Sequence, residues 1–309
     1  MKRRTLLAGL ATPALAQPAT IRIISPYTPA GASDTLGRFA AQALTEALGI
    51  PVVVENRPGA GGNLGAEMVA RATPDGTTLL VLAAAHTANA SLYRNVPFQV
   101  LRDFTPICVV GVVPNMLSVH PALPVRDLAE FIAFARAQPQ GVAYGSAGVG
   151  TLPHLAMELV RNRAGFLAVH VPFRGSAPAI TELVSGRIQA VLENLPPQVG
   201  QARAGGIRPI AMATAARLPE WPDVPAIAET WPGFEAVAWQ SLVAPAGTPM
   251  PLVRRIAEIV LAATAAQAPR LRGQGIIPGT IGPDAFPDFL RAEVHKWAEA
   301  VRLSGAVAE

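Results

Sequence analysis

Short runs of β-branched and other apolar residues alternate with stretches of helical periodicity from residue 21 onward. The extended runs lie at 21–25, 51–55, 78–83, 142–145, 168–171, 188–192 and 236–243. Helical patterns lie between them, and a final one covers about 284–303. Strands that alternate with helices are typical of α/β proteins with largely parallel sheets. Since 309 residues suffice for about two such units, we predict a second α/β unit in the middle of the chain.

The first helix has recognisable ends. Ser33 is a candidate N-cap, and Asp34 follows it in the first turn. Leu36 and Leu44 lie on the apolar face, and Gly49 stands just past the expected C-terminus. The N-terminus of this helix therefore points at whatever fills the preceding loop.

The N-terminal residues have the pattern of an export signal. Met1-Lys2-Arg3-Arg4 is followed by an apolar stretch over 6–15 and by the small-x-small site Ala14-Leu15-Ala16. We predict cleavage after Ala16 and export by the twin-arginine or the general secretory route. An amphipathic first helix is the alternative, and Pro13 argues against it.

Charge and hydropathy exclude two further classes of protein. Without Lys2, Arg3 and Arg4 the formal net charge falls from +4 to +1, and the remaining arginines are scattered singly. A nucleic-acid-binding protein needs a cluster of basic residues, so nucleic acid is not an expected partner. Apolar runs such as 79–85 are too short to span a membrane.

Cys108 is the single cysteine, and we expect a buried, inert thiol.

Three loops between a strand and a helix are rich in glycine and hydroxyl residues, and they cover 26–34, 144–151 and 174–177. Free N–H groups at a helix N-terminus favour an anion. An α/β fold also needs glycines and caps at such turns, so each loop taken alone is weak evidence for a ligand. Three in one chain make an anion site a reasonable hypothesis.

Motifs for cofactors and catalysis fail at specific positions. A dinucleotide fingerprint that starts at Gly59 would need glycine where Leu64 stands. Lys296 is the one lysine outside the export signal, and no Walker A sequence contains it. The five histidines lack metal-binding spacing, and Ser146 does not lie in a G-x-S-x-G elbow. We therefore expect no cofactor, no metal and no catalytic residue, and predict that the protein is not an enzyme.

Five segments carry a resemblance to a known family. They are 52–65 (VVVENRPGAGGNLG), 73–80 (TPDGTTLL), 144–151 (YGSAGVGT), 171–175 (VPFRG) and 239–249 (WQSLVAPAGTP). In these segments the chain resembles the Bug family, the periplasmic solute-binding proteins of tripartite tricarboxylate transporters. The resemblance extends over nearly the whole chain after the export signal.

The resemblance implies a two-lobed periplasmic binding protein, a type II Venus flytrap whose lobes are each a largely parallel sheet flanked by helices. It places the crossings between lobes near Val119 and Val237. Lobe 1 is then 17–119 with 238–309, lobe 2 is 120–237, and 1–16 is the export signal. The implied function is capture of a small carboxylated metabolite by a periplasmic monomer, which delivers it to integral membrane permease subunits. A ligand-sensing partner of a membrane sensor kinase and an exported enzyme that acts on a carboxylate are the alternatives.

The family pattern also implies the ligand contacts. By position they are Tyr27, Thr28, Ala30, Gly31, Ser33, Asp34, Ala85, His86, Ser146, Gly150, Thr151, Arg174, Gly175 and Glu193. Two positions depart from the pattern, because the family usually has paired glycines where Ala30-Gly31 stands and aspartate where Glu193 stands.

Three of these residues have an alternative role that does not involve a ligand. Asp34 could offset the helix dipole, and its charge would repel a carboxylate. Glu193 could be a solvated residue at a strand end, and Tyr27 could pack across the lobe interface. The sequence leaves the identity of the ligand open among dicarboxylates, aromatic acids, amino acids and amides.

Overall fold

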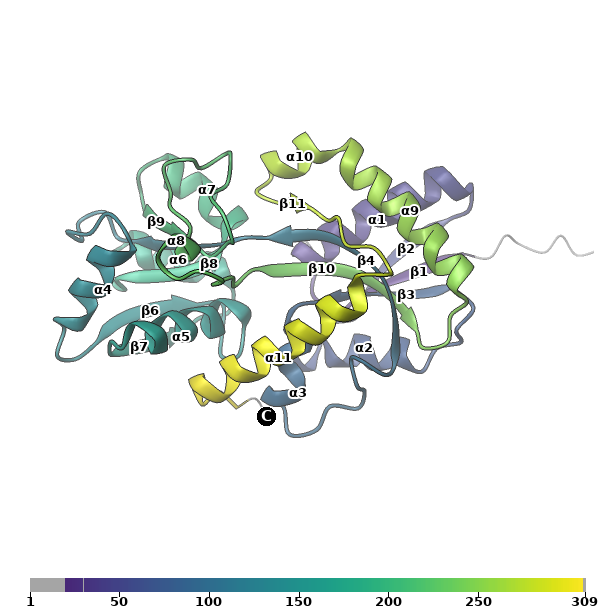
Figure 1. The fold of residues 1–309 in the computed structure, drawn as a ribbon, viewed down its shortest axis with the longest axis horizontal. Coiled ribbons are helices and arrows are strands. Elements are labelled where there is room, and N and C mark those ends of the chain that lie inside the picture. Colours follow the sequence, from purple (N-terminus) through teal and green to yellow (C-terminus); the bar gives the residue numbers. More distant parts are fainter. Residues whose placement is uncertain (1–19, 30, 308–309) are drawn as a thin grey trace, which may run out of the picture.

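The computed structural model describes residues 20–29 and 31–307, which form two α/β units side by side (Figure 1). The sheet of the first unit has the strand order β11-β4-β10-β3-β1-β2. Its strands are β1 (Ile21–Ser25), β2 (Val52–Asn56), β3 (Thr78–Ala83), β4 (Phe104–Val113), β10 (Ala238–Pro245) and β11 (Ile277–Pro278). Its helices are α1 (Ala32–Leu48), the short 3₁₀ turn η1 (Ala60–Gly62), α2 (Asn63–Ala70), α3 (Ala85–Leu92), α9 (Met250–Ala266), α10 (Ala268–Gly273) and α11 (Phe286–Ser304).

The second unit is formed by the middle of the chain, as predicted. Its sheet has the order β7-β6-β8-β5-β9. The strands are β5 (Asn115–Val119), β6 (Val142–Ser146), β7 (Ala168–Pro172), β8 (Ala190–Asn194) and β9 (Arg208–Met212). The helices are α4 (Leu128–Arg136), α5 (Leu152–Ala164), α6 (Ser176–Val184), α7 (Leu195–Arg203) and α8 (Ile227–Thr230).

Most strands within each sheet run in one direction, which confirms the prediction of largely parallel sheets. In the first sheet β1 pairs in parallel with β2 and β3, whereas β10 is antiparallel to both β3 and β4. In the second sheet β6 pairs in parallel with β7 and β8, and β5 is antiparallel to its neighbours β8 and β9. In both units the carboxyl ends of the parallel strands carry the loops that the sequence singles out.

The chain passes between the sheets at two adjacent places. Strand β4 ends at Val113, and after Pro114 the chain continues as β5 in the second sheet. It returns just before β10, where the Asn115 side-chain amide donates to the Ala236 carbonyl over 2.9 Å and ties the two passages together. Strand membership thus puts the first passage at Pro114, upstream of Val119, while the lobe boundaries at 119 and 237 stay predictions.

Helix α1 begins at Ala32, two residues earlier than a cap at Ser33 would place it. Its N-cap is Gly31, in extended conformation, and no side chain caps the helix. The prediction of Ser33 as the cap is wrong, because the Ser33 hydroxyl donates instead to Gln240 Oε1 over 2.6 Å, on strand β10. The predicted end is correct, since Gly49 closes the helix in the left-handed conformation with φ +68°.

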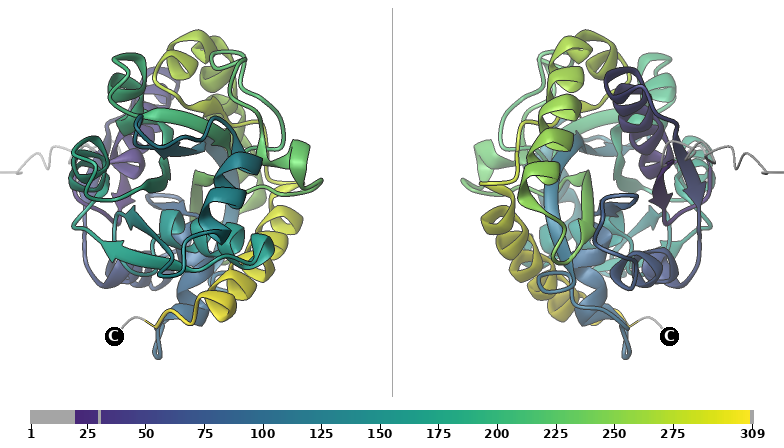
Figure 2. Two further views of the ribbon diagram at one scale, coloured as in Figure 1. Left: turned by 90° about the vertical axis from the view of Figure 1, so that its left-hand side faces the viewer. Right: turned by 90° about the vertical axis from the view of Figure 1, so that its right-hand side faces the viewer.

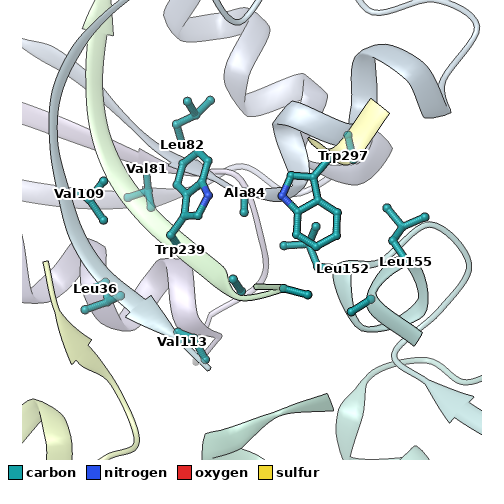
Figure 3. Close-up of a cluster of buried hydrophobic side chains, with 14 of the residues drawn as sticks. Leu36, Val81, Leu82, Ala84, Val109, Val113, Leu152, Leu155, Trp239 and Trp297 are labelled. Carbon is teal, nitrogen blue, oxygen red and sulfur yellow. The ribbon is translucent and has the colours of Figure 1, made fainter. Parts of the chain in front are cut away.

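Helices cover both sheets, as the two end views show (Figure 2). Strand β3 is buried along its whole length, as expected for a strand with helices on both faces. Trp239 of β10 and Trp297 of α11 are fully buried (Figure 3). Cys108 is buried as expected, and burial raises the pKa of its thiol to about 12, which leaves it protonated and unreactive.

Helix α11 joins the two units a third time. It belongs to the first unit by sequence, and it packs on α3 of that unit and on α5 of the second. Trp297 lies beside Leu152 and Leu155 of α5 (Figure 3). The two units are therefore held together by apolar packing as well as by their connecting strands.

The predicted export signal lies outside the described residues. Within the part that the structure does describe, none of the helices combines the length and the apolar character that crossing a membrane would require.

Candidate functional site

A cavity of about 630 Å³ lies between the two units. The first unit contributes the start of α1, the end of β4 and the α10–β11 connection, and the second unit contributes the starts of α6 and α7. The lining residues are Gly31, Ala32, Thr35, Val113, Ser176, Asn194, Pro196, Pro197, Gln274 and Ile276. Cavities of this volume suit small organic ligands.

Hydrogen-bond donors are distributed unevenly around this cavity. At the start of α1 the first-turn N–H groups have no intrahelical acceptor, and the helix dipole adds partial positive charge. Helix α7 differs, because Pro196 and Pro197 have no N–H and the Leu195 N–H donates to the Pro114 carbonyl over 2.8 Å. The starts of α1 and α6 can therefore donate hydrogen bonds to an anion in the cavity, whereas the start of α7 contributes few donors.

Of the fourteen predicted contacts, Gly31 lines the cavity, and Gly175 and Glu193 directly precede the lining residues Ser176 and Asn194. Thr28 and Arg174 are exposed, and Ala30 lies outside the described residues. The fourteen residues together stay a prediction of the ligand site. Several of their polar groups already form hydrogen bonds within the protein, as the following paragraphs describe.

Asp34 is held inside the first unit. It is buried, Arg38 donates to Oδ2 over 3.0 Å, and the Asn56 side chain donates to Oδ1 over 2.9 Å. These contacts support the alternative of a structural first-turn acid. The carboxylate orders the start of α1 and fixes β2 against it.

Tyr27 and His86 pack together near η1. Their rings meet edge to face with centroids 5.9 Å apart, and the Tyr27 hydroxyl donates to the Gly61 carbonyl over 3.2 Å. His86 is fully buried, and its Nδ1 accepts from the Ala83 N–H over 3.1 Å. Burial lowers the pKa of His86 to about 4, so the ring is neutral at physiological pH. Ala85, the first residue of α3, is partly buried beside it.

His86 is expected to make the protein sensitive to acid. Its pKa in the folded state is below the ordinary value of 6.5, so the unfolded chain binds the proton more tightly. Stability is therefore complete above about pH 6.5 and falls as the pH approaches 4, by about 2 kcal/mol at about pH 5 from this residue. Urea unfolding should show that His86→Gln removes this part of the pH dependence. His295→Gln, at an exposed position, should leave it unchanged, and equal pH profiles for all three proteins would refute the assignment.

The loop between β6 and α5 is stabilised by its own hydrogen bonds. The Thr151 hydroxyl donates to the Gly148 carbonyl over 2.7 Å, and the Gly148 N–H donates to Ser146 Oγ over 3.1 Å. Ser146 Oγ also lies 2.6 Å from His170 Nε2, and the Gly150 N–H donates to His154 Nδ1 over 3.0 Å. Thr151 occupies the N-cap position of α5, but its side chain does not cap the helix.

Two histidines that the sequence reasoning did not place in the site support this loop. The His154 and His170 rings stack with centroids 4.0 Å apart, and Tyr144 stacks on His170. Burial is the main reason that the pKa of His154 falls to about 4. Neutral rings can accept from the loop, so the stack acts as a support for it.

Gly150 sits where the two units touch. It has φ +74°, and a side chain there would bring Cβ to 2.4 Å from Leu92 Cδ2 at the end of α3. We expect Gly150→Ala to cost about 1–3 kcal/mol and to push the units apart, because left-handed alanine is strained and the new methyl group clashes. Chemical unfolding and small-angle scattering would measure both effects.

Gly165→Ala is the matched control. Gly165 ends the same helix with φ +66° and has open space around it, so the substitution has the backbone cost without the clash. If both variants lose the same stability and keep the same radius of gyration, Gly150 does not serve as a contact between the units.

Glu193 is the most unusual group beside the cavity. Its side chain is 0% exposed, which rules out the solvated alternative. Oε1 accepts from the Asn194 N–H over 2.8 Å, whereas Oε2 is buried and makes no hydrogen bond to the described residues. Burial raises the pKa of this carboxyl to about 7, and the Asn194 N–H, the Ser176 hydroxyl and the Ala147 N–H offset this only in part.

Sequence reasoning missed Ser176, Asn194, Thr35 and Gln274 as cavity residues. Ser176 had a signal, because it follows Gly175 at a helix start that the glycine pattern identifies. Gln274 had none, since it reaches the cavity only because the fold brings the α10–β11 connection, far along the chain, next to the start of α1. In the described part of the chain, no three His, Cys, Asp or Glu side chains are grouped to hold a metal ion.

Comparisons with known proteins agree with this geometry. A family model described as the tripartite tricarboxylate transporter family receptor matches residues 36–298. Protein BugT of Bordetella pertussis is 35% identical over 309 residues, which cover 97% of this chain and 94% of BugT.

Two solved structures are similar in fold and sequence. R. palustris Rpa4515 with adipate has a TM-score of 0.82 and 34% identity, covering 94% of this chain and 99% of that one. MatC (Rpa3494) from Rhodopseudomonas palustris with bound malate has a TM-score of 0.77 and 29% identity, covering 91% and 98%. The predicted fold class and the Bug resemblance are confirmed. This chain belongs to the tripartite tricarboxylate transporter receptor family and is a solute-binding receptor of the TctC and Bug type.

Proposed function

We propose that this receptor captures a small carboxylated metabolite between its two units, in the periplasm, and delivers it to the permease subunits of a tripartite tricarboxylate transporter. The observation that carries the proposal is the cavity of about 630 Å³ that both units line, with the α1 N-terminus at one wall. The structures of relatives with adipate and with malate support the ligand class.

The available contacts are sufficient for useful affinity. Hydrogen bonds to a charged group contribute about 1.5–3 kcal/mol each, and a helix terminus adds about 0.3–1 kcal/mol. Micromolar binding needs about 8 kcal/mol, which a few such contacts reach. A ligand that touches both units binds their closed arrangement better than an open one and shifts the population toward closure. Binding and release need no covalent chemistry, which is why we propose a receptor without enzymatic activity.

Thermal unfolding with a panel of small carboxylates and neutral amides tests the ligand class. A ligand at about 100 times its Kd should add about 2.7 kcal/mol to the free energy of unfolding. Ser176→Ala should weaken the binding of any hit, and Thr181→Ala, which removes an exposed hydroxyl of the same helix, should not. Absence of any carboxylate hit, or equal effects of the two substitutions, would contradict this site.

Two further measurements test delivery and the absence of turnover. Ligand recovered after incubation should be chemically unchanged, since a product would indicate an enzyme. Crosslinking in membranes should capture the permease subunits when ligand is present. Capture of a sensor kinase in their place would assign the receptor to signalling.

A further inference from the structure

The wall that the second unit contributes to the cavity has a buried carboxyl directly behind it. Ser176 at the start of α6 and Asn194 at the end of β8 line the cavity, and Glu193 precedes Asn194 in the strand. The Glu193 side chain is 0% exposed. Its Oε1 accepts from the Asn194 N–H over 2.8 Å, and the Ser176 hydroxyl and the Ala147 N–H also favour its charged form. Glu193 therefore interacts with the loop after β6, the start of α6 and the end of β8.

The start of α6 can donate to an anion in the cavity. Its N-cap is Gly175 with φ +114°, and no side chain caps the helix. The first-turn N–H groups of Ser176 and Ala177 consequently have no intrahelical acceptor. The Ser176 hydroxyl lies at the cavity and beside the Glu193 carboxyl, and its single hydrogen can serve only one of them at a time. The wall thus contains a donor whose direction depends on its neighbour.

The charge of Glu193 decides which way this hydroxyl donates. An ionised carboxyl only accepts, so it draws the Ser176 hydrogen to itself, and its charge repels an anion. A protonated carboxyl has one O–H, and Oε2, which makes no hydrogen bond to the described residues, is the oxygen free to carry it. This O–H can donate to Ser176 Oγ, which leaves the Ser176 hydrogen for a ligand. Burial raises the pKa of Glu193 to about 7, so both forms are populated near neutral pH.

The other ionisable groups packed around Glu193 keep their charge in this range of pH. Strand β5 has none, and α7 has one only at its last residue, Arg203. The remaining groups are Tyr144, His154, Glu158, His170, Arg174, Glu182 and, across the cavity, Asp34. The two glutamates and Asp34 are each paired with an arginine. Burial raises the pKa of Tyr144 and lowers that of both histidines from 6.5, for His154 to about 4. Within this cluster, Glu193 is the group whose charge changes near pH 7.

We propose that Glu193 is a positioning residue that couples the capture of a carboxylate to the uptake of one proton. A ligand carboxylate at the start of α6 takes the Ser176 hydrogen, while Glu193 Oε2 binds a proton from solvent and donates it to Ser176 Oγ. No covalent bond to the ligand forms, and release returns the proton to solvent. The inference rests on the proposed function and adds a regulation to its site, since the receptor binds more tightly in acid than in alkaline surroundings.

Calorimetric titration at about pH 6, 7 and 8 tests the coupling, with succinate, malate, glutarate, adipate and benzoate as probes. The Kd of the tightest probe should be about tenfold larger at about pH 8 than at about pH 6, because the protonated fraction of this carboxyl falls by that factor. Titration at about pH 7 in two buffers of different ionisation enthalpy should show the uptake of about half a proton for each ligand bound.

Two pairs of variants locate the effect. Glu193→Gln should abolish both the change in Kd and the proton uptake, and Glu235→Gln, at an exposed carboxyl, should keep them. The titration of the probe itself is common to both variants, so their difference isolates Glu193. Ser176→Ala should weaken binding more in acid than in alkaline buffer, because its hydroxyl faces the ligand only when Glu193 is protonated. Thr181→Ala on the same helix should have no effect.

The possible failures are distinguishable. Equal Kd values across the pH range, or a pH dependence that persists in Glu193→Gln, would overturn the inference and leave the proposed function standing. Equal effects of Ser176→Ala in acid and alkaline buffer would also overturn it, and this test serves even where Glu193→Gln does not fold. Failure of every probe to bind at any pH would overturn the proposed function and the inference with it.

Discussion

Replacement of Glu193 by Gln is expected to raise the free energy of unfolding by about 3 kcal/mol at about pH 8 and to change it little near pH 4. Burial raises the pKa of this carboxyl from 4.5 to about 7 in the folded protein. The folded state therefore holds the proton more tightly than the unfolded chain does. Stability conferred by the protonated form is complete below about pH 4.5 and is lost as the pH rises toward 7. Gln is neutral at every pH and avoids that loss.

The measurement is urea unfolding of the ligand-free protein at both pH values. Glu235→Gln, which changes an exposed carboxyl, should be neutral at both. A gain for Glu193→Gln that is equal at the two pH values would mean that the buried charge is not its cause.

A second large effect, on the free energy of unfolding, is expected when Glu293 is replaced. Its Oε2 accepts from Trp239 Nε1 over 2.7 Å and from Trp297 Nε1 over 2.9 Å, and both indole rings are fully buried. Glu293→Ala leaves two buried N–H donors without a partner, each at about 1–3 kcal/mol, and removes packed atoms. We expect a loss of about 3–5 kcal/mol in the free energy of unfolding.

Glu293→Gln separates the hydrogen bonds from the charge. Its amide oxygen can still accept from an indole N–H, so the loss of free energy of unfolding should be less than half of that for Glu293→Ala. Both variants remove the ion pair with Lys296. Glu299→Ala, at an exposed position of the same helix, should cost within about 0.5 kcal/mol. Equal losses for the two Glu293 variants would show that the indole N–H groups are not the reason.

The sequence predicted those strands and helix ends that depend on neighbouring residues alone. Strands β1, β3 and β6 and the Gly49 end of α1 were predicted from periodicity and glycine alone. The long strand β4 was missed, because Pro106 and Gly111 interrupt its apolar run. The strand tolerates that proline because Pro106 pairs with Val243 at an irregularity in the ladder with β10, a partner far along the chain.

The candidate site shows the same limit. Two of the three glycine-rich loops, 26–34 and 174–177, contribute residues to the cavity wall, but the sequence could not tell which polar groups of the loops are already bound. Ser33 is bound to Gln240, Asp34 to Asn56 and Ser146 to His170, and each partner lies on a different element. The complete burial of the Glu193 side chain is likewise visible only in the folded arrangement.

The packing of α11 on both units has a consequence for the movement of the two units. Trp297 lies beside Leu155 of the second unit (Figure 3), so this contact contributes to the stability of the arrangement of the two units described here. Any movement that separated α5 from α11 would have to break the contact, and a ligand bound between the units would add to its effect. The free energy of one apolar contact at the C-terminal helix therefore helps to set how far the two units separate when no ligand holds them.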